Sequence, residues 1–111
     1  MRVAIVGTCA SGKSTIASAL NERGFDAYIV GQEHSEIRHL WSRRSPDALV
    51  FLEISLEAVR SRRSADWPEW LYMRQRSRLS SAREHADVIV DTSTEDVQVS
   101  LDRIVTGLAG N

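Results

Sequence analysis

Four short apolar runs alternate along the chain with segments whose apolar residues recur at helical spacing. The clearest run, residues 48–54, is nearly all apolar, which is typical of a strand covered on both faces. The four runs occupy residues 2–6, 25–30, 48–54 and 87–91. Strands that alternate with helices predict right-handed crossovers and a parallel sheet with helices on both sides. We therefore expect an α/β fold, a three-layer, doubly wound parallel sheet of about four strands.

Helix start and stop signals lie between the first three runs. Gly24 stands where the first predicted helix, residues 13–23, would end. Ser35 is the expected cap of a short helix that carries Ile37, Leu40 and Trp41 on one face and ends before Pro46. Ser55 is the expected cap of the helix that follows the third strand.

Two more helices are predicted in the second half of the chain. Asp66 and Pro68 mark the start of a helix of roughly five turns. Its inward stripe consists of Leu71, Gln75, Leu79, Ala82 and Ala86. Ser93 and Asp96 resemble a capping box at the start of the last helix. The apolar face of that helix carries Val97, Leu101, Ile104, Val105 and Leu108.

Size and composition exclude several classes of protein. A chain of 111 residues predicts one domain, residues 1–111, with one hydrophobic core. A net charge of −1 argues against a general binder of nucleic acids or acidic membranes. The single cysteine, Cys9, excludes an intrachain disulfide, and the first apolar run is too short for a signal-peptide core or a membrane span. We expect a cytoplasmic protein with no nucleic-acid or membrane partner.

The candidate chemistry is concentrated in residues 7–14 (GTCASGKS), which match the phosphate-loop pattern in every defined position. The chain has thirteen arginines and one lysine, and that lysine, Lys13, stands where the pattern requires one. Gly7 and Gly12 allow backbone angles that side chains disfavour, so that N–H groups can converge on phosphate oxygens. Lys13 is a compact charge that can reach the terminal phosphates, and Ser14 offers a hydroxyl to Mg²⁺.

The context of this loop agrees with its mechanism. It follows a predicted strand and opens a predicted helix, whose positive N-terminal end attracts the same anion. We therefore expect nucleotide binding, with ATP and Mg²⁺ as cofactors. The expected nucleotide-binding residues of the loop are Gly7, Thr8, Cys9, Ala10, Ser11, Gly12, Lys13, Ser14 and Thr15.

With this loop, the stretches 47–63 and 86–92 and a last amphipathic helix, the chain resembles the small P-loop kinases of nucleosides and nucleoside monophosphates, in a shortened form. The resemblance implies a kinase-like P-loop NTPase fold. It also implies a lid that closes on the donor phosphates, in which Arg60 and Arg63 are catalytic candidates and Arg62 is a nucleotide-binding candidate. The residues expected beside the base are Asp91, Thr92 and Ser93.

The chain departs from this family between the first helix and the strand at 48–54. The family normally has two strands there, but only one fits, so the acid that organises magnesium has no separate counterpart. A right-handed crossover places the strand at 25–30 beside the first strand, which would bring Gln32, Glu33 and His34 over the phosphate loop. Glu33 is then either an acid that helps to hold Mg²⁺ or a general base toward an acceptor hydroxyl; the alternative is a solvated loop carboxylate. His34 is expected to cap a helix or face solvent.

The middle of the chain is rich in arginine. Residues 38–83 hold ten basic and five acidic residues, which exceeds what solubility requires and predicts an anionic ligand such as phosphate. Trp67 and Trp70 lie in the same segment, where we expect them to complete the core or a subunit interface rather than stack on a base. A homodimer in which one chain's arginines complete the other's site is compatible with this composition.

Two classes of function remain open at this stage. The leading one is an ATP- and Mg²⁺-dependent phosphotransferase, with Lys13, Glu33, Arg60 and Arg63 as catalytic residues and an unidentified small-molecule acceptor. The other is a nucleotide-binding switch or regulatory module with little or no transfer activity, which the short chain and the missing acidic strand favour. A GTP switch is disfavoured because its guanine motif, Asn-Lys-x-Asp, needs a second lysine. RNA binding through residues 38–83 lacks the stacked aromatic motifs of RNA modules.

Overall fold

The computed structural model describes residues 1–94 and 96–110 of the chain. These residues form a parallel four-stranded sheet in the order β2-β1-β3-β4. Its strands are β1 (Arg2–Gly7), β2 (Asp26–Ile29), β3 (Ala48–Glu53) and β4 (Val88–Asp91). The four predicted strands and the place of the second beside the first are confirmed.

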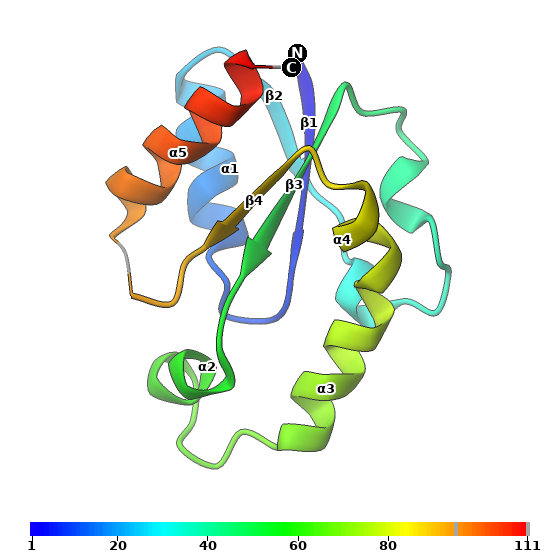
Figure 1. The fold of residues 1–111 in the computed structure, drawn as a ribbon, viewed down its shortest axis with the longest axis vertical. Coiled ribbons are helices and arrows are strands. Elements are labelled where there is room, and N and C mark those ends of the chain that lie inside the picture. The colour runs from blue at the N-terminus through cyan, green and yellow to red at the C-terminus, as the bar shows by residue number, and fades with distance from the viewer. Residues whose placement is uncertain (95, 111) are drawn as a thin grey trace.

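Helices cover both faces of the sheet (Figure 1). The helices α1 (Lys13–Glu22) and α5 (Val97–Ala109) lie on one face. The other face carries α4 (Ser80–His85) and residues 31–47, which include the 3₁₀ turns η1 (Gln32–His34) and η2 (Leu40–Ser42). The two remaining helices, α2 (Leu56–Arg62) and α3 (Glu69–Arg78), lie toward the carboxyl ends of the strands. The expected α/β fold with a parallel sheet between helices is confirmed at this level.

Both faces of the sheet are buried, which explains the unbroken apolar runs. Val3 and Ile5 of β1 belong to the core beneath α1 and α5, whereas Ala4 and Val6 belong to the core beneath α4. A smaller cluster beyond the carboxyl ends of the strands joins Ile54, Val59 and Tyr72. The two tryptophans of residues 63–70 differ in burial. The first, Trp67, packs on this cluster, but Trp70 is 67% exposed, so it is not a core residue.

The predicted five-turn helix is two helices that meet at Leu79. The buried Leu79 and Ala82 pack on the sheet, whereas Tyr72 packs on the cluster beyond the strand ends. Leu79, with φ −92° and ψ −4°, is both the C-terminal cap of α3 and the N-terminal cap of α4. The expected stripe is correct in its buried members Gln75, Leu79 and Ala82.

The short helix predicted after Ser35 does not form. A buried glutamine takes the backbone groups of this segment instead: Gln32 donates from Nε2 to the carbonyl oxygen of Ile37 (2.7 Å) and accepts the N–H of Trp41 at Oε1 (3.0 Å). Ser35 Oγ accepts the N–H of Ile37, whose side chain is 47% exposed. The segment is therefore an ordered loop with two 3₁₀ turns rather than an amphipathic helix.

The caps of two helices were predicted with different success. Ser55 caps α2 as expected, because its Oγ accepts the N–H of Ala58. The prediction of a capping box at the start of α5 was wrong. The cap is Asp96 alone, which accepts the N–H of Val99, whereas Ser93 Oγ accepts the N–H of Ser55. In the part of the chain that the structure describes, no helix combines the length and hydropathy needed to cross a membrane.

Candidate functional site

The glycine-rich loop, residues 7–14, joins β1 to α1, and its two glycines serve different purposes. Gly12 has a φ of 94°, in the left-handed region that favours glycine, as expected. Gly7 is required for space instead, because a Cβ atom there would lie 2.5 Å from Ser11 Oγ and 2.8 Å from the carbonyl oxygen of Leu52. Ala10 also has a positive φ of 68°. The loop is thus held tightly against β3.

The start of α1 opens into a cavity of about 470 Å³. The first intrahelical hydrogen bond runs from Ile16 N–H to the carbonyl oxygen of Gly12, and within the described chain no side chain caps this helix. The N–H groups of the first helical turn are therefore available to a ligand. The lining comprises Cys9, Ala10, Gly12, Lys13, Ser14, Thr15, Ile29, Glu33, His34, Arg62 and Arg63. An anion in this cavity would meet both the helix terminus and cationic side chains.

Lys13 and Glu33 form an ion pair in this cavity, with Lys13 Nζ 2.7 Å from Glu33 Oε2. Lys13 Nζ also donates to the carbonyl oxygens of Gly7 (3.0 Å) and Thr8 (2.9 Å). The Glu33 side chain is only 4% exposed, and its Oε1 has no hydrogen-bond partner among the described residues. Glu33 is therefore not a solvated loop carboxylate. It is a buried acid held beside the lysine by η1.

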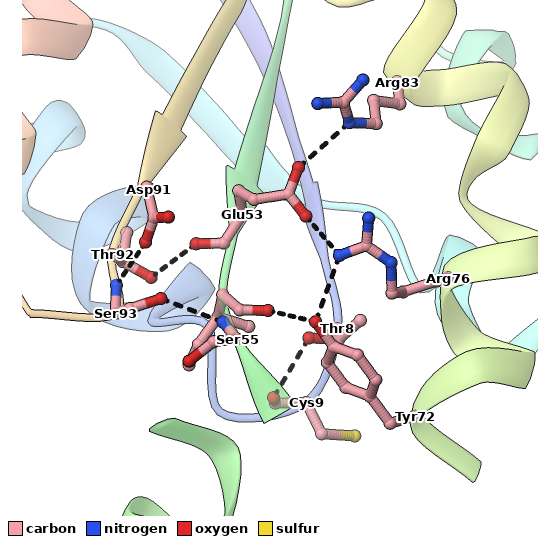
Figure 2. A network of polar contacts seen from close by, with 11 residues as sticks. Thr8, Cys9, Glu53, Ser55, Tyr72, Arg76, Arg83, Asp91, Thr92 and Ser93 are labelled. Carbon is pink, nitrogen blue, oxygen red and sulfur yellow. Dashed lines mark hydrogen bonds and ion pairs between the residues drawn. The ribbon is translucent and has the colours of Figure 1, made fainter. Parts of the chain in front are cut away.

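The structure also decides between the two acids that follow the strands on either side of β1. Glu53 ends β3, but its carboxylate is bound by Arg76 (2.5 Å) and Arg83 (3.0 Å) on the face of α3 and α4 (Figure 2). It does not belong to the lining of the cavity, whereas Glu33 does. Glu33 is therefore the carboxylate that is placed to act on a ligand of the loop.

Of the three arginines expected in a lid, two line the cavity and one does not. Arg62 and Arg63 line the cavity, whereas Arg60 donates from Nε to the carbonyl oxygen of Trp67 (3.0 Å) and lies away from it. Arg62 donates to the carbonyl oxygen of Ala10 (2.9 Å) and also to that of Thr92. Both Arg62 and Arg63 are exposed and line the cavity, and Arg62 also holds the loop.

A second cavity, of about 300 Å³, lies between the loop, the start of α1 and the start of α5. It is lined by Ala10, Ser11, Gly12, Thr15, Ile16, Arg62, Thr92, Val97 and Ser100. Of the residues expected beside a base, Thr92 lines this cavity and donates from Oγ1 to the carbonyl oxygen of Ser11 (2.8 Å). Ser93 lies outside it, next to Ser55. Asp91 accepts the N–H of Ser93, and hydrogen bonds from the side chain and backbone of Ser93 lower the pKa of Asp91.

Sequence reasoning missed the residue that clamps the loop from the opposite side, Gln75 of α3. Its Oε1 accepts the N–H of Cys9 (3.1 Å), and its Nε2 donates to Cys9 Sγ (3.2 Å). Gln75 is 2% exposed. The signal was present, because a polar amide in the inward stripe of a helix needs a partner when it is buried.

Three arginines of the arginine-rich segment, Arg76, Arg78 and Arg83, form ion pairs within the described chain. Arg76 binds Glu53 and the hydroxyl of Tyr72 (3.1 Å), and that hydroxyl donates to the carbonyl oxygen of Ile54 (2.5 Å; Figure 2). The hydrogen bond to Tyr72, followed by the charge of Glu53, raises the pKa of Arg76. Arg78 pairs with Glu36 (2.8 Å). Part of the arginine content therefore stabilises the fold, so the number of arginines is a weaker sign of an anionic ligand than it is in the sequence alone.

No protein-family model matches the chain, and no curated protein or solved structure shows significant similarity to it. The kinase resemblance of the glycine-rich loop and its flanking segments stays a prediction. A functional conclusion therefore depends on the residues and their geometry alone.

Proposed function

We propose that the chain is an ATP- and Mg²⁺-dependent phosphotransferase with a kinase-like P-loop fold, acting on a small-molecule acceptor. One observation carries the proposal. Lys13, the only lysine of the chain, lies with its Nζ atom 2.7 Å from Oε2 of the buried Glu33. Both residues line the cavity of about 470 Å³ at the start of α1, where no side chain of the described residues caps the helix. Phosphoryl transfer needs little more than positioned cations, a carboxylate and a loop of N–H donors.

The residues present fit a magnesium nucleotide. Oε1 of Glu33 is buried without a partner in the described chain, and oxygen ligands are those that Mg²⁺ prefers. Ser14 is exposed at the first turn of α1 and lines the same cavity. Ser14 and Glu33 would hold the ion, which supplies charge neutralisation at the phosphates when bound.

The chain's own residues then have defined tasks. Lys13 exchanges its contacts with the Gly7 and Thr8 carbonyl oxygens for the terminal phosphates, and the N–H groups of the first turn of α1 bind phosphate oxygens. Arg63 adds positive charge at the rim of the cavity as charge spreads over the transferred phosphoryl group. Glu33 would help to hold the ion or accept the proton of the acceptor hydroxyl as the new P–O bond forms and ADP leaves.

A panel of nucleosides, nucleoside monophosphates and small alcohols, each incubated with ATP and Mg²⁺, tests this proposal. We expect acceptor-dependent ADP release from the wild type, and none from Lys13→Ala, which also loses ATP affinity. Glu33→Gln should keep ATP affinity but lose turnover by about 100-fold or more, because it removes the one unpartnered carboxylate oxygen that the described residues contribute to the cavity. The matched control is Glu36→Gln, since the Glu36 side chain is 78% exposed. Normal turnover in Glu33→Gln contradicts the role of this residue.

A nucleotide-binding switch or regulatory module is the second candidate, and one observation favours it. The Nζ atom of Lys13 has three internal partners, Gly7, Thr8 and Glu33, so a ligand must displace contacts that the chain already makes. ATP binding without acceptor-dependent ADP release, across the same panel, decides for this candidate.

A further inference from the structure

Three residues with metal-binding side chains meet at the mouth of the same cavity. Cys9 Sγ, a carboxylate oxygen of Glu33 and a ring nitrogen of His34 all lie within 4.8 Å of one another. Cys9 follows β1, whereas Glu33 and His34 belong to η1, which follows β2. Because β1 and β2 are adjacent parallel strands, their carboxyl ends bring the three side chains together.

One observation beside the geometry of the cluster indicates a site for a cation. Oε1 of Glu33 is buried and has no partner among the described residues, although Oε2 is neutralised by Lys13. Leaving a buried carboxylate oxygen unsatisfied is costly, and a metal ligand bond removes that cost. Gln75 Nε2 donates to Cys9 Sγ (3.2 Å), which orients the sulfur.

We propose that Cys9, Glu33 and His34 form a binding site for a thiophilic divalent metal ion such as Zn²⁺. A thiolate and an imidazole select against Mg²⁺ and Ca²⁺, which take oxygen ligands. Tetrahedral zinc with bonds of about 2.0–2.3 Å places its ligand atoms roughly 3.4–3.8 Å apart. The three ligand atoms here lie within 4.8 Å of one another, so a side-chain movement of about 1 Å brings them to that spacing. His34 supplies that shift because its side chain is 63% exposed.

Three protein ligands leave the fourth position of the ion to water or to a ligand of the cavity. The thiol of Cys9 loses its proton to solvent as the Zn–S bond forms. Both the ion and the proposed magnesium nucleotide use Glu33, so the two compete. This last step rests on the proposed function, whereas the metal site itself does not.

Cobalt substitution tests the site directly. Because Cys9 is the only cysteine, a thiolate-to-cobalt charge-transfer band in the near ultraviolet can come from no other residue. We expect this band at one equivalent of Co²⁺ in metal-free wild-type protein, and its loss when Zn²⁺ is added but not when Mg²⁺ is added. Titration calorimetry with Zn²⁺ should show binding weakened at least 10-fold by Cys9→Ser and by His34→Ala.

The control is His39→Ala, since His39 packs against Trp41 and His85 and does not belong to the cluster, so this change should leave Zn²⁺ affinity unchanged. If Cys9→Ser does not fold, His34→Ala decides alone, because His34 is exposed. Absence of the charge-transfer band, or Zn²⁺ affinity equal to wild type in His34→Ala, overturns the metal site. Failure of metal-free wild type to bind ATP with Mg²⁺ overturns only the proposed function and the competition that depends on it.

Discussion

Glu33 and Glu53 follow the strands on either side of β1, and their neighbours give them different tasks. Glu53 has two arginine partners, Arg76 of α3 and Arg83 of α4, so its carboxylate joins β3 to these two helices. Glu33 has one oxygen bound by Lys13 and one without a partner in the described chain. A carboxylate whose partners are complete stabilises the fold, whereas one that is buried and incompletely paired is available for chemistry.

The Glu53 network can be tested through stability. Glu53→Gln removes the charge between Arg76 and Arg83, and Glu53 is only 18% exposed, so we expect a loss of about 1–3 kcal/mol in the free energy of unfolding. The measurement is urea denaturation. Arg83→Ala removes a partner that is 52% exposed and should cost less than about 1 kcal/mol. An equal loss in the two variants would contradict a central role for the carboxylate.

Asp91 gives a prediction that depends on pH. Hydrogen bonds from the side chain and the N–H of Ser93 hold the pKa of Asp91 below its usual value of 3.8. A carboxyl group whose pKa is lowered in the folded state stabilises the protein above the unfolded pKa, and this stabilisation is lost as pH falls through the folded pKa. Asp91→Asn should therefore reduce the urea midpoint at neutral pH, and the difference from wild type should shrink below pH ~3.8. An equal difference at both pH values would be inconsistent with this origin.

At the scale of elements, α3 does more than cover the sheet, because Gln75 ties it to the glycine-rich loop. Gln75→Leu keeps the size of the side chain but leaves the Cys9 N–H without its acceptor, so we expect a loss of about 1–3 kcal/mol in the free energy of unfolding. Hydrogen exchange of the Cys9 amide should become faster. Arg74→Ala, an exposed change on the same helix, should alter stability by less than about 0.5 kcal/mol. Unchanged exchange at Cys9 would show that α3 does not hold the loop.

The elements that could be predicted are those whose pattern is local. The strands at 48–54 and 87–91 are apolar runs, and the crossover rule placed β2 beside β1 and hence Glu33 beside Lys13. The helix break at Leu79 and the loop after Ser35 have no such pattern, since residues 71–86 form one inward stripe in the sequence and Gln32 lies outside the predicted short helix. No local signal reveals that the Gln32 side chain takes the backbone groups that a helix after Ser35 would have used.

The same division applies to the candidate site. Lys13 and Glu33 could be placed because each follows a strand of the predicted sheet at the same edge. The different positions of Arg60 and Arg63 could not be predicted, because only the tertiary contact with Trp67 turns Arg60 away from the cavity. Arg63 is the C-terminal cap of α2 and lies just beyond the helix, so helical spacing does not give its direction.

At the scale of the whole molecule, the glycine-rich loop is the point where distant parts of the chain meet. Arg62 of α2, Gln75 of α3 and Thr92 after β4 bind the loop at Ala10, Cys9 and Ser11 respectively. The loop is thus held in one conformation by contacts that span most of the described chain. A ligand that binds this conformation and not the unfolded chain must stabilise the entire fold.

This coupling gives the last prediction. At a concentration 100 times its Kd, ATP with Mg²⁺ should add about 2.7 kcal/mol to the free energy of unfolding, which raises the Tm of a domain of this size by on the order of 10 °C. Differential scanning calorimetry measures the shift. Lys13→Ala should abolish it, whereas Arg74→Ala, outside the cavity lining, should leave it intact. A wild-type Tm that does not change with ATP and Mg²⁺ would contradict nucleotide binding, because a preformed loop cannot bind a ligand without this gain in stability.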